Sequence, residues 1–128
     1  MELAAAEAQL GVLLPVRHRQ AMLDPADPIH EAYDFLVLAS PFELLRWVEV
    51  NESLHAPNQW NSWPPFVVAF ASNGCGDYFA YDTRTEPYRV YYIGPEFTVS
   101  QAIATCEAEG FVFSNFDDWY SYAVSRDA

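Results

Sequence analysis

The pattern of apolar and polar positions predicts helices at both ends of the chain. Residues 2–10 are rich in alanine and are followed by Gly11, which suits a left-handed helix cap. Pro15 suits the first turn of a second helix over residues 15–23, which ends at the aspartates and prolines of residues 24–28. A buried strand is expected next, over residues 34–38, an aspartate followed by four apolar residues.

Residues 40–43 have the sequence Ser-Pro-Phe-Glu, a capping box with proline at the first helical position. It predicts a helix to about residue 51. The apolar positions fit a helical period and not the alternation of a strand. We expect its buried stripe to contain Phe42, Leu45 and Val48, with Leu44 as a further candidate.

Two more helices are predicted near the carboxyl end. Residues 98–101 form a second capping box, and Gly110 is a suitable stop for the helix that it opens. The last helix begins at residues 114–117. Its apolar positions recur at the spacing of one helix face, which we expect to pack on a sheet: Phe116, Trp119, Tyr120, Ala123 and Val124.

Between these helices the sequence predicts three antiparallel strands, at residues 66–71, 78–82 and 88–93. The first has no polar alternation, which is typical of a strand covered on both faces. A tight turn follows it, where Asn73, Gly74 and Gly76 tolerate positive φ. The expected fold is therefore α+β: one domain over residues 1–128, with a mainly antiparallel central sheet flanked by amino-terminal and carboxyl-terminal helices.

Residues 52–65 contain three prolines, two asparagines and two tryptophans, so we predict a long loop before the sheet. Long loops often carry function. Trp60 and Trp63 could therefore anchor a partner, because tryptophan is enriched at binding hot spots. The alternative is that both indoles fold back over the edge of the core.

The charge balance changes the picture of possible partners. Eighteen acidic residues face six basic ones, all arginine, giving a net charge of −12. This balance disfavours binding to nucleic acid or anionic membranes and favours encounter with a basic protein. Three acids that border the predicted turns are candidate contacts with such a partner, Asp77, Asp82 and Glu86; the alternative is that the charge serves solubility.

Two cysteines, Cys75 and Cys106, have no zinc or redox spacing. We expect both to be reduced and mostly buried, although the sequence leaves a disulfide between them open. The amino-terminal residues lack the features of a signal peptide, and no apolar stretch has the length of a membrane span. A cytoplasmic protein, monomeric or weakly dimeric, is expected.

No motif predicts catalysis or a cofactor. His18, His30 and His55 lack metal-site spacing, so no metal site is expected. Cys75, on the predicted turn, is a candidate nucleophile, but it would need a histidine base that no local pattern supplies.

Five segments occur in a fixed order: LGVLLPVRHRQAML (10–23), FLVLASPFELLRW (35–47), FVVAFASNGCGDYFAYD (66–82), YRVYYI (88–93) and FSNFDDWY (113–120). Taken together they resemble the SUKH superfamily, which includes a fungal cell-wall-assembly regulator family (SMI/KNR) and bacterial immunity proteins that neutralise toxins. The resemblance implies an α+β fold and a role in binding without catalysis. It carries over Gly74, Gly76 and Asp77 as turn positions of the fold.

Three functional hypotheses follow. The first is a non-catalytic immunity protein that covers the basic active surface of a toxin, such as a nuclease, because an inhibitor of that surface should be acidic and carry aromatic anchors. The second is an intracellular scaffold or regulatory protein of the SMI/KNR type. The third is a small hydrolase that depends on Cys75.

Overall fold

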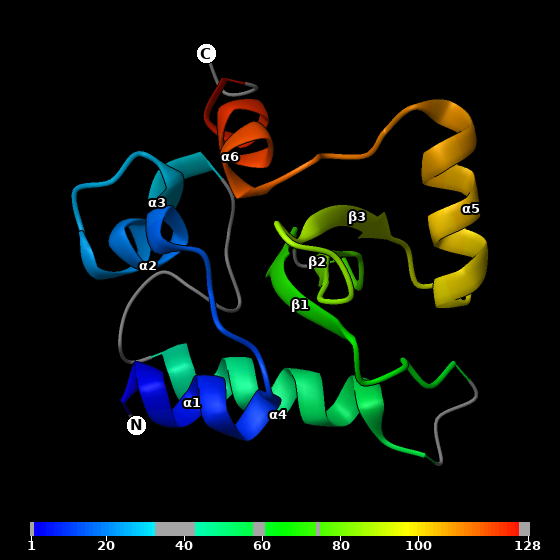
Figure 1. Ribbon diagram of the computed structural model, residues 1–128, viewed down its shortest axis with the longest axis horizontal. Helices are drawn as coiled ribbons and strands as arrows, with labels where there is room; N and C mark the ends of the chain where they lie inside the picture. The colour runs from blue at the N-terminus through cyan, green and yellow to red at the C-terminus, as the bar shows by residue number, and fades with distance from the viewer. Residues whose placement is uncertain (1, 33–42, 58–60, 74, 126–128) are drawn as a thin grey trace.

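The computed structural model describes residues 2–32, 43–57, 61–73 and 75–125. The predicted strand 34–38, residues 40–42 of the first capping box, Trp60 and Gly74 lie outside the described residues. Within them the predicted α+β fold is confirmed, with helices packed around an antiparallel sheet (Figure 1).

The helices lie close to their predicted positions, and a short helix, α3, was not predicted. The second capping box is formed, with the Thr98 hydroxyl accepting from the Gln101 N–H, and Gly110 ends that helix with a left-handed φ of 70°. The helices are α1 (Leu3–Leu10), α2 (Val16–Leu23), α3 (Ile29–Ala32), α4 (Leu44–His55), α5 (Val99–Glu109) and α6 (Phe116–Ser125).

The described strands form a three-stranded antiparallel sheet in the order β1 (Val67–Ser72), β2 (Tyr78–Asp82) and β3 (Arg89–Ile93). β1 and β2 pair from Val67 opposite Asp82 to Ser72 opposite Tyr78, with one irregularity between Ala69 and Ala71. Every residue of β1 is buried, as its continuous apolar sequence predicted.

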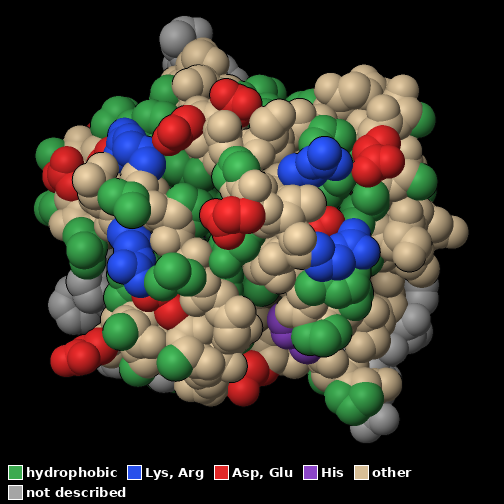
Figure 2. All heavy atoms as spheres, in the orientation of Figure 1, with side chains coloured by type: hydrophobic (Ala, Val, Ile, Leu, Met, Phe, Trp, Pro, Cys, Tyr) green, Lys and Arg blue, Asp and Glu red, His purple; other side chains and the backbone are tan. Residues whose placement is uncertain are grey.

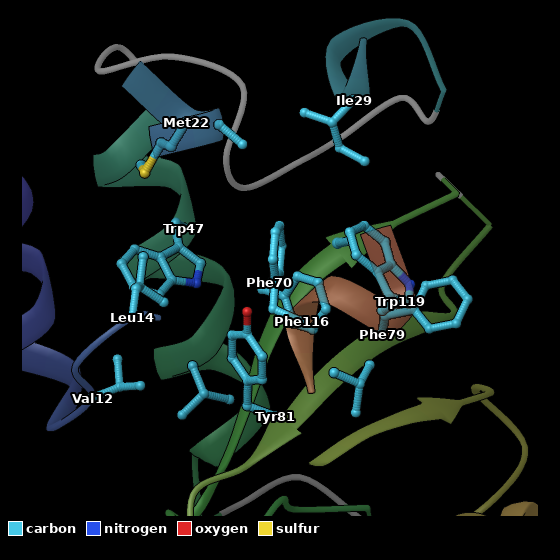
Figure 3. Packing of buried hydrophobic residues seen from close by; sticks show 14 of the residues in the cluster. Val12, Leu14, Met22, Ile29, Trp47, Phe70, Phe79, Tyr81, Phe116 and Trp119 are labelled. Atoms are coloured by element: carbon cyan, nitrogen blue, oxygen red, sulfur yellow. The ribbon is translucent and has the colours of Figure 1, made fainter. Parts of the chain in front are cut away.

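Helices cover both faces of this sheet. One face carries the larger core, in which Phe70 stacks on Tyr81 at 4.3 Å and meets Trp119 of α6 edge-on at 4.8 Å (Figure 3). The other face packs against α5 and Trp63, through a smaller cluster that includes Val67 and Ala80. In Figure 1, α1 and α4 lie together on one side of the sheet, α2, α3 and α6 gather on another, and α5 stands beyond β3.

The outer edge of β1 is hydrogen-bonded by side chains from α4. The Asn51 amide accepts from the Ala69 N–H at 2.8 Å and donates to the Ala69 carbonyl at 3.0 Å. Trp47 Nε1 donates to the same carbonyl at 2.8 Å, and His55 Nε2 donates to the Val67 carbonyl at 2.7 Å. These three residues recur every fourth position, so one face of the helix satisfies an edge that would otherwise offer open pairing groups.

The edge of β3 is covered as well. Val90 exchanges two backbone hydrogen bonds with Phe113, of 2.9 and 3.2 Å, in an isolated bridge. The Cys106 thiol of α5 donates to the Tyr92 carbonyl at 3.3 Å. Both outer strands of the described sheet therefore have partners for edge groups.

Two expectations for α4 were wrong. Leu45 is exposed, and the buried stripe consists of Leu44, Trp47, Val48 and Asn51, because the face that meets β1 is set by the polar edge contacts as well as by apolar residues. The helix also continues to His55, so the loop predicted over residues 52–65 begins four residues later.

Replacing Asn51 by leucine should lower the free energy of unfolding by about 2–3 kcal/mol, because the buried Ala69 N–H loses its partner and all three hydrogen bonds of the Asn51 amide are lost. Urea denaturation measures the change. Glu52→Gln is the matched control, since Glu52 is the next residue of the same helix and is exposed. Equal stability of the two variants would show that the Asn51 contacts contribute nothing.

Candidate partner-binding surface

Buried carboxylates are each matched with an arginine. In the described part of the chain three acids are buried, and each makes an ion pair: Glu7 with Arg19, Asp27 with Arg17 at 3.3 Å, and Asp82 with Arg84 at 2.9 Å. These pairs use three of the eighteen acids and three of the six arginines, leaving fifteen acids and three arginines outside them. On the face in Figure 2, acids and arginines lie interspersed and do not form one patch.

Asp27 shows how such a pair is held. Burial by itself would raise the pKa of the Asp27 carboxyl, but hydrogen bonds from the Ile29 N–H, the Tyr120 hydroxyl and Arg17 outweigh it and lower the pKa. The Arg17 guanidinium also lies over the Tyr120 ring, 4.3 Å from its centre. This cluster fixes α2 to α6.

Asp82 and Glu86, two of the predicted contact acids, lie at one end of the sheet. Asp82 is 4% exposed and accepts from the Arg84 backbone and side chain. Burial would raise the pKa of Asp82, but these bonds prevail and lower it. Glu86 is exposed in the same β2–β3 turn. Asp82 thus holds the turn together, and Glu86 keeps its carboxylate in solvent.

Asp77 and Trp63 lie at the opposite end. The Asp77 carboxylate accepts from Asn73 Nδ2 at 2.9 Å and from the Tyr92 hydroxyl, so it ties the β1–β2 turn to β3. Trp63 is 4% exposed and meets Tyr78 edge-on at 5.7 Å. It therefore covers the core, which is the alternative that the sequence left open for it.

The turn between β1 and β2 follows from its residues. Asn73 Oδ1 accepts from the Cys75 N–H at 3.0 Å, and Gly76 has a φ of 85°, a conformation that favours glycine. Cys75 is exposed on this turn and Cys106 is buried, and both are free thiols. The expectation that both cysteines are mostly buried was wrong for Cys75, because the turn projects from the sheet.

The four candidate contacts that lie within the described residues do not form one surface. Asp77 directly precedes β2 and Asp82 ends it, Glu86 accompanies Asp82, and Trp63 is on the Asp77 side. Their role in binding a partner therefore stays a prediction. In this structure Asp82 holds the β2–β3 turn and Trp63 covers the core.

Two hollows mark the surface at these two ends. One, of about 220 Å³, is lined by residues that include Trp63, Tyr78 and Pro95. The other, of about 420 Å³, lies between α2, the β2–β3 turn and the start of α6. We call it the α2–α6 groove; its lining includes Pro15, Val16, Arg17, Pro87, Tyr88 and Asp117.

Sequence reasoning missed the α2–α6 groove. It explained Asp117 by its position in the first turn of a helix, and it did not single out Leu13 or Val16. Both are exposed aliphatic residues, 65% and 71% respectively, flanking Leu14 and Pro15. The available signal was the run of apolar residues around the start of α2. A helix buries apolar residues on one face only, so some of this run had to remain exposed.

The three histidines form no common site. His18 hydrogen-bonds Tyr81, His30 donates to backbone carbonyls of residues 21 and 24, and His55 donates to Val67. Among the described residues, no group of three or more His, Cys, Asp or Glu side chains could hold a metal ion. The histidines are used by the fold.

His18 is buried among aromatic rings. It stacks on Phe116 at 4.6 Å and its Nδ1 lies 2.6 Å from the Tyr81 hydroxyl. Burial lowers the pKa of His18 to about 3 and raises that of Tyr81 well above its usual value, so both are neutral at physiological pH. His18 and His30 line an internal cavity of about 10 Å³, room for about one water and none for a substrate.

Comparison with known proteins identifies the family. The model of the SMI1 / KNR4 family (SUKH-1) matches residues 1–121, nearly the whole chain. The chain belongs to this family. No curated protein and no solved structure matches the chain.

The resemblance predicted from the sequence is thereby confirmed at the level of the SUKH superfamily. Membership of the SMI1 / KNR4 family is consistent with an immunity-type or regulatory protein that binds other proteins. Among the described residues, no helix combines the length and apolar character that a membrane crossing needs.

Asp82→Asn should lower the free energy of unfolding by about 1 kcal/mol, because it weakens the charge-assisted bonds that close the β2–β3 turn. Glu86→Gln in the same turn should change stability little, since its side chain is exposed. Urea denaturation of both variants at neutral pH makes the comparison. Equal effects would contradict a structural role for Asp82.

The low pKa of His18 predicts acid destabilisation. The unfolded chain binds a proton near pH 6.5 and the folded one near 3, so the stability from neutral His18 is complete above 6.5 and falls as the pH drops below it. The loss should be about 1.4 kcal/mol per pH unit down to about pH 4.5.

Urea denaturation between pH 8 and 4.5 measures this loss, and His18→Gln should flatten the profile. If that variant fails to fold, NMR titration of the wild-type imidazole gives the answer directly. A His18 midpoint near 6.5 would refute the prediction.

Proposed function

We propose that this protein is a non-catalytic immunity protein that binds one toxin and blocks its active surface. The observation that carries the proposal is the family match over residues 1–121. The mechanism is occupation: a folded acidic domain covers the toxin without making or breaking a bond. The partner is a basic toxin domain, such as a nuclease, and the setting is the cytoplasm.

The charge distribution supports a basic partner. Buried acids are neutralised by their own arginines, so the net charge of −12 belongs to the remaining fifteen acids and three arginines. Toxins that cut nucleic acid must attract phosphates and therefore carry basic surfaces. Opposite charges raise the association rate and exclude acidic competitors.

The rigidity of the sheet supports inhibition by occupation. Its outer strands are hydrogen-bonded along their edges by α4, α5 and residue 113, and its two faces are covered by helices. A preorganised binding partner loses little conformational entropy on association, which favours tight stoichiometric complexes.

The second candidate function is an intracellular regulatory or scaffold protein, because the matching family is named after SMI1 and KNR4. The two functions predict different binding. An immunity protein binds one partner tightly and associates much faster at low salt, whereas a scaffold binds several partners weakly with a modest response to salt.

Co-expression tests the proposal. A toxin domain encoded next to this gene should stop growth of a bacterial host, and this protein should restore it. A catalytically inactive toxin should form a 1:1 complex on size-exclusion chromatography. Its association rate should fall at least about tenfold between low and high salt, since exposed charges are screened within about 10 Å at 0.1 M.

A Cys75→Ala variant is the control for catalysis, because Cys75 is the exposed thiol and the candidate nucleophile. It should protect as well as the wild type. Failure to protect against any neighbouring toxin, together with the absence of a bound basic protein on purification, would leave the immunity function unsupported. Loss of protection in Cys75→Ala with retained complex formation would indicate chemistry.

A further inference from the structure

The α2–α6 groove combines an apolar wall with an acidic end. Its volume is about 420 Å³, within the range of sites that accept side chains or small ligands. Val16 lines it and is 71% exposed, and Leu13 beside it is 65% exposed. Pro87 and Tyr88 form the facing wall, and Asp117 lies at the start of α6. Aliphatic surface of this kind gains free energy when a partner covers it.

The walls of the groove are tied to one another. The Leu13 N–H donates to the Tyr88 hydroxyl at 3.4 Å, which links the segment before α2 to the start of β3. The Leu14 N–H donates to the buried Glu7 carboxylate at 2.7 Å. At the far end, Asn115 caps α6 by accepting from the Asp118 N–H at 2.9 Å. The groove is therefore built before a partner arrives, which lowers the entropy lost on binding.

The free charge of the groove is negative. Its lining contains one guanidinium, Arg17, whose charge is offset by Asp27 at 3.3 Å. Asp117 lines the groove and is exposed, and Glu86, also exposed, precedes the lining residue Pro87. The described lining of the groove therefore offers one exposed carboxylate, Asp117, and no uncompensated cation.

We propose that the α2–α6 groove docks a protein segment carrying an aliphatic side chain next to an arginine or lysine. The aliphatic group packs on Val16 and Tyr88, and the cation faces Asp117. The inference rests on the proposed function for the identity of the partner, a basic toxin domain. The binding preference of the groove does not depend on that identity and can be tested without the toxin. A second copy of this acidic chain would bring carboxylates against carboxylates and is the poorer occupant.

Peptide titration tests the chemistry without the toxin. The peptide acetyl-Leu-Arg-Val-Arg-amide, added to isotope-labelled protein, should shift the backbone amide NMR signals of Val16, Tyr88 and Asp117. The acidic analogue acetyl-Leu-Glu-Val-Glu-amide and the analogue with serine in place of leucine and valine should shift them much less. Signals that move mainly around Leu45 or Phe97, or equal shifts with the acidic peptide, would overturn the proposal.

Paired variants locate the contact. Asp117→Asn should weaken binding of the basic peptide about two- to fivefold, whereas Asp118→Asn should not. Both residues are exposed in the first turn of α6, so the pair removes the same charge and the same helix-dipole interaction, but Asp118 does not line the groove. Equal weakening by the two variants would contradict a specific role for the groove.

Val16→Ser and Leu23→Ser form the apolar pair, since both residues are exposed in α2 and Leu23, 59% exposed, lines neither hollow. Val16→Ser should weaken peptide binding and Leu23→Ser should not. Concentration-dependent dimerisation that Val16→Ser abolishes would assign the groove to a second copy and overturn the proposal.

The same variants separate this inference from the proposed function. If the wild type protects cells from the neighbouring toxin but the Val16 and Asp117 variants protect equally well, the function stands and the groove is not the docking site. If no toxin is neutralised but the basic peptide still binds at the groove, the docking proposal is supported and the immunity function is not.

Discussion

The structure depends on the match between the Asn51 amide and the two polar groups of Ala69. β1 is buried on both faces, so water cannot serve its outer edge, and a buried peptide group without a partner is costly. One side-chain amide supplies both a donor and an acceptor, and Trp47 and His55 extend the same row. This constraint sets α4 against the sheet, and α1 then packs on α4.

Local signals predicted most of the secondary structure. The Thr98 capping box, the glycine stops and the apolar run of β1 act within a few residues, so the sequence displays them directly. The buried face of α4 could not be predicted in this way. Leu45 is apolar and exposed, while Asn51 is polar and buried, because the position opposite Ala69 demands hydrogen bonds. A hydrophobic pattern cannot reveal a polar residue selected by a strand eighteen residues away.

The candidate surface was harder to predict for the same reason. The acids near the predicted turns are of two kinds that look identical in sequence: Asp82 is held by Arg84, whereas Glu86 is exposed. The α2–α6 groove joins segments near residues 16, 88 and 117, and their proximity exists only after folding. The net charge predicts a basic partner, but only the folded structure shows where apolar surface lies beside exposed acids.

The pairing of each buried acid with an arginine separates two kinds of charge. The three buried carboxylates, which hold helices and a turn in place, are matched with arginines inside the molecule, whereas fully exposed carboxylates have little part in folding. Exposed acids can therefore be exchanged, moved or lost over generations at small risk to the domain. A domain of this kind can change the charge of its surface while its interior stays the same.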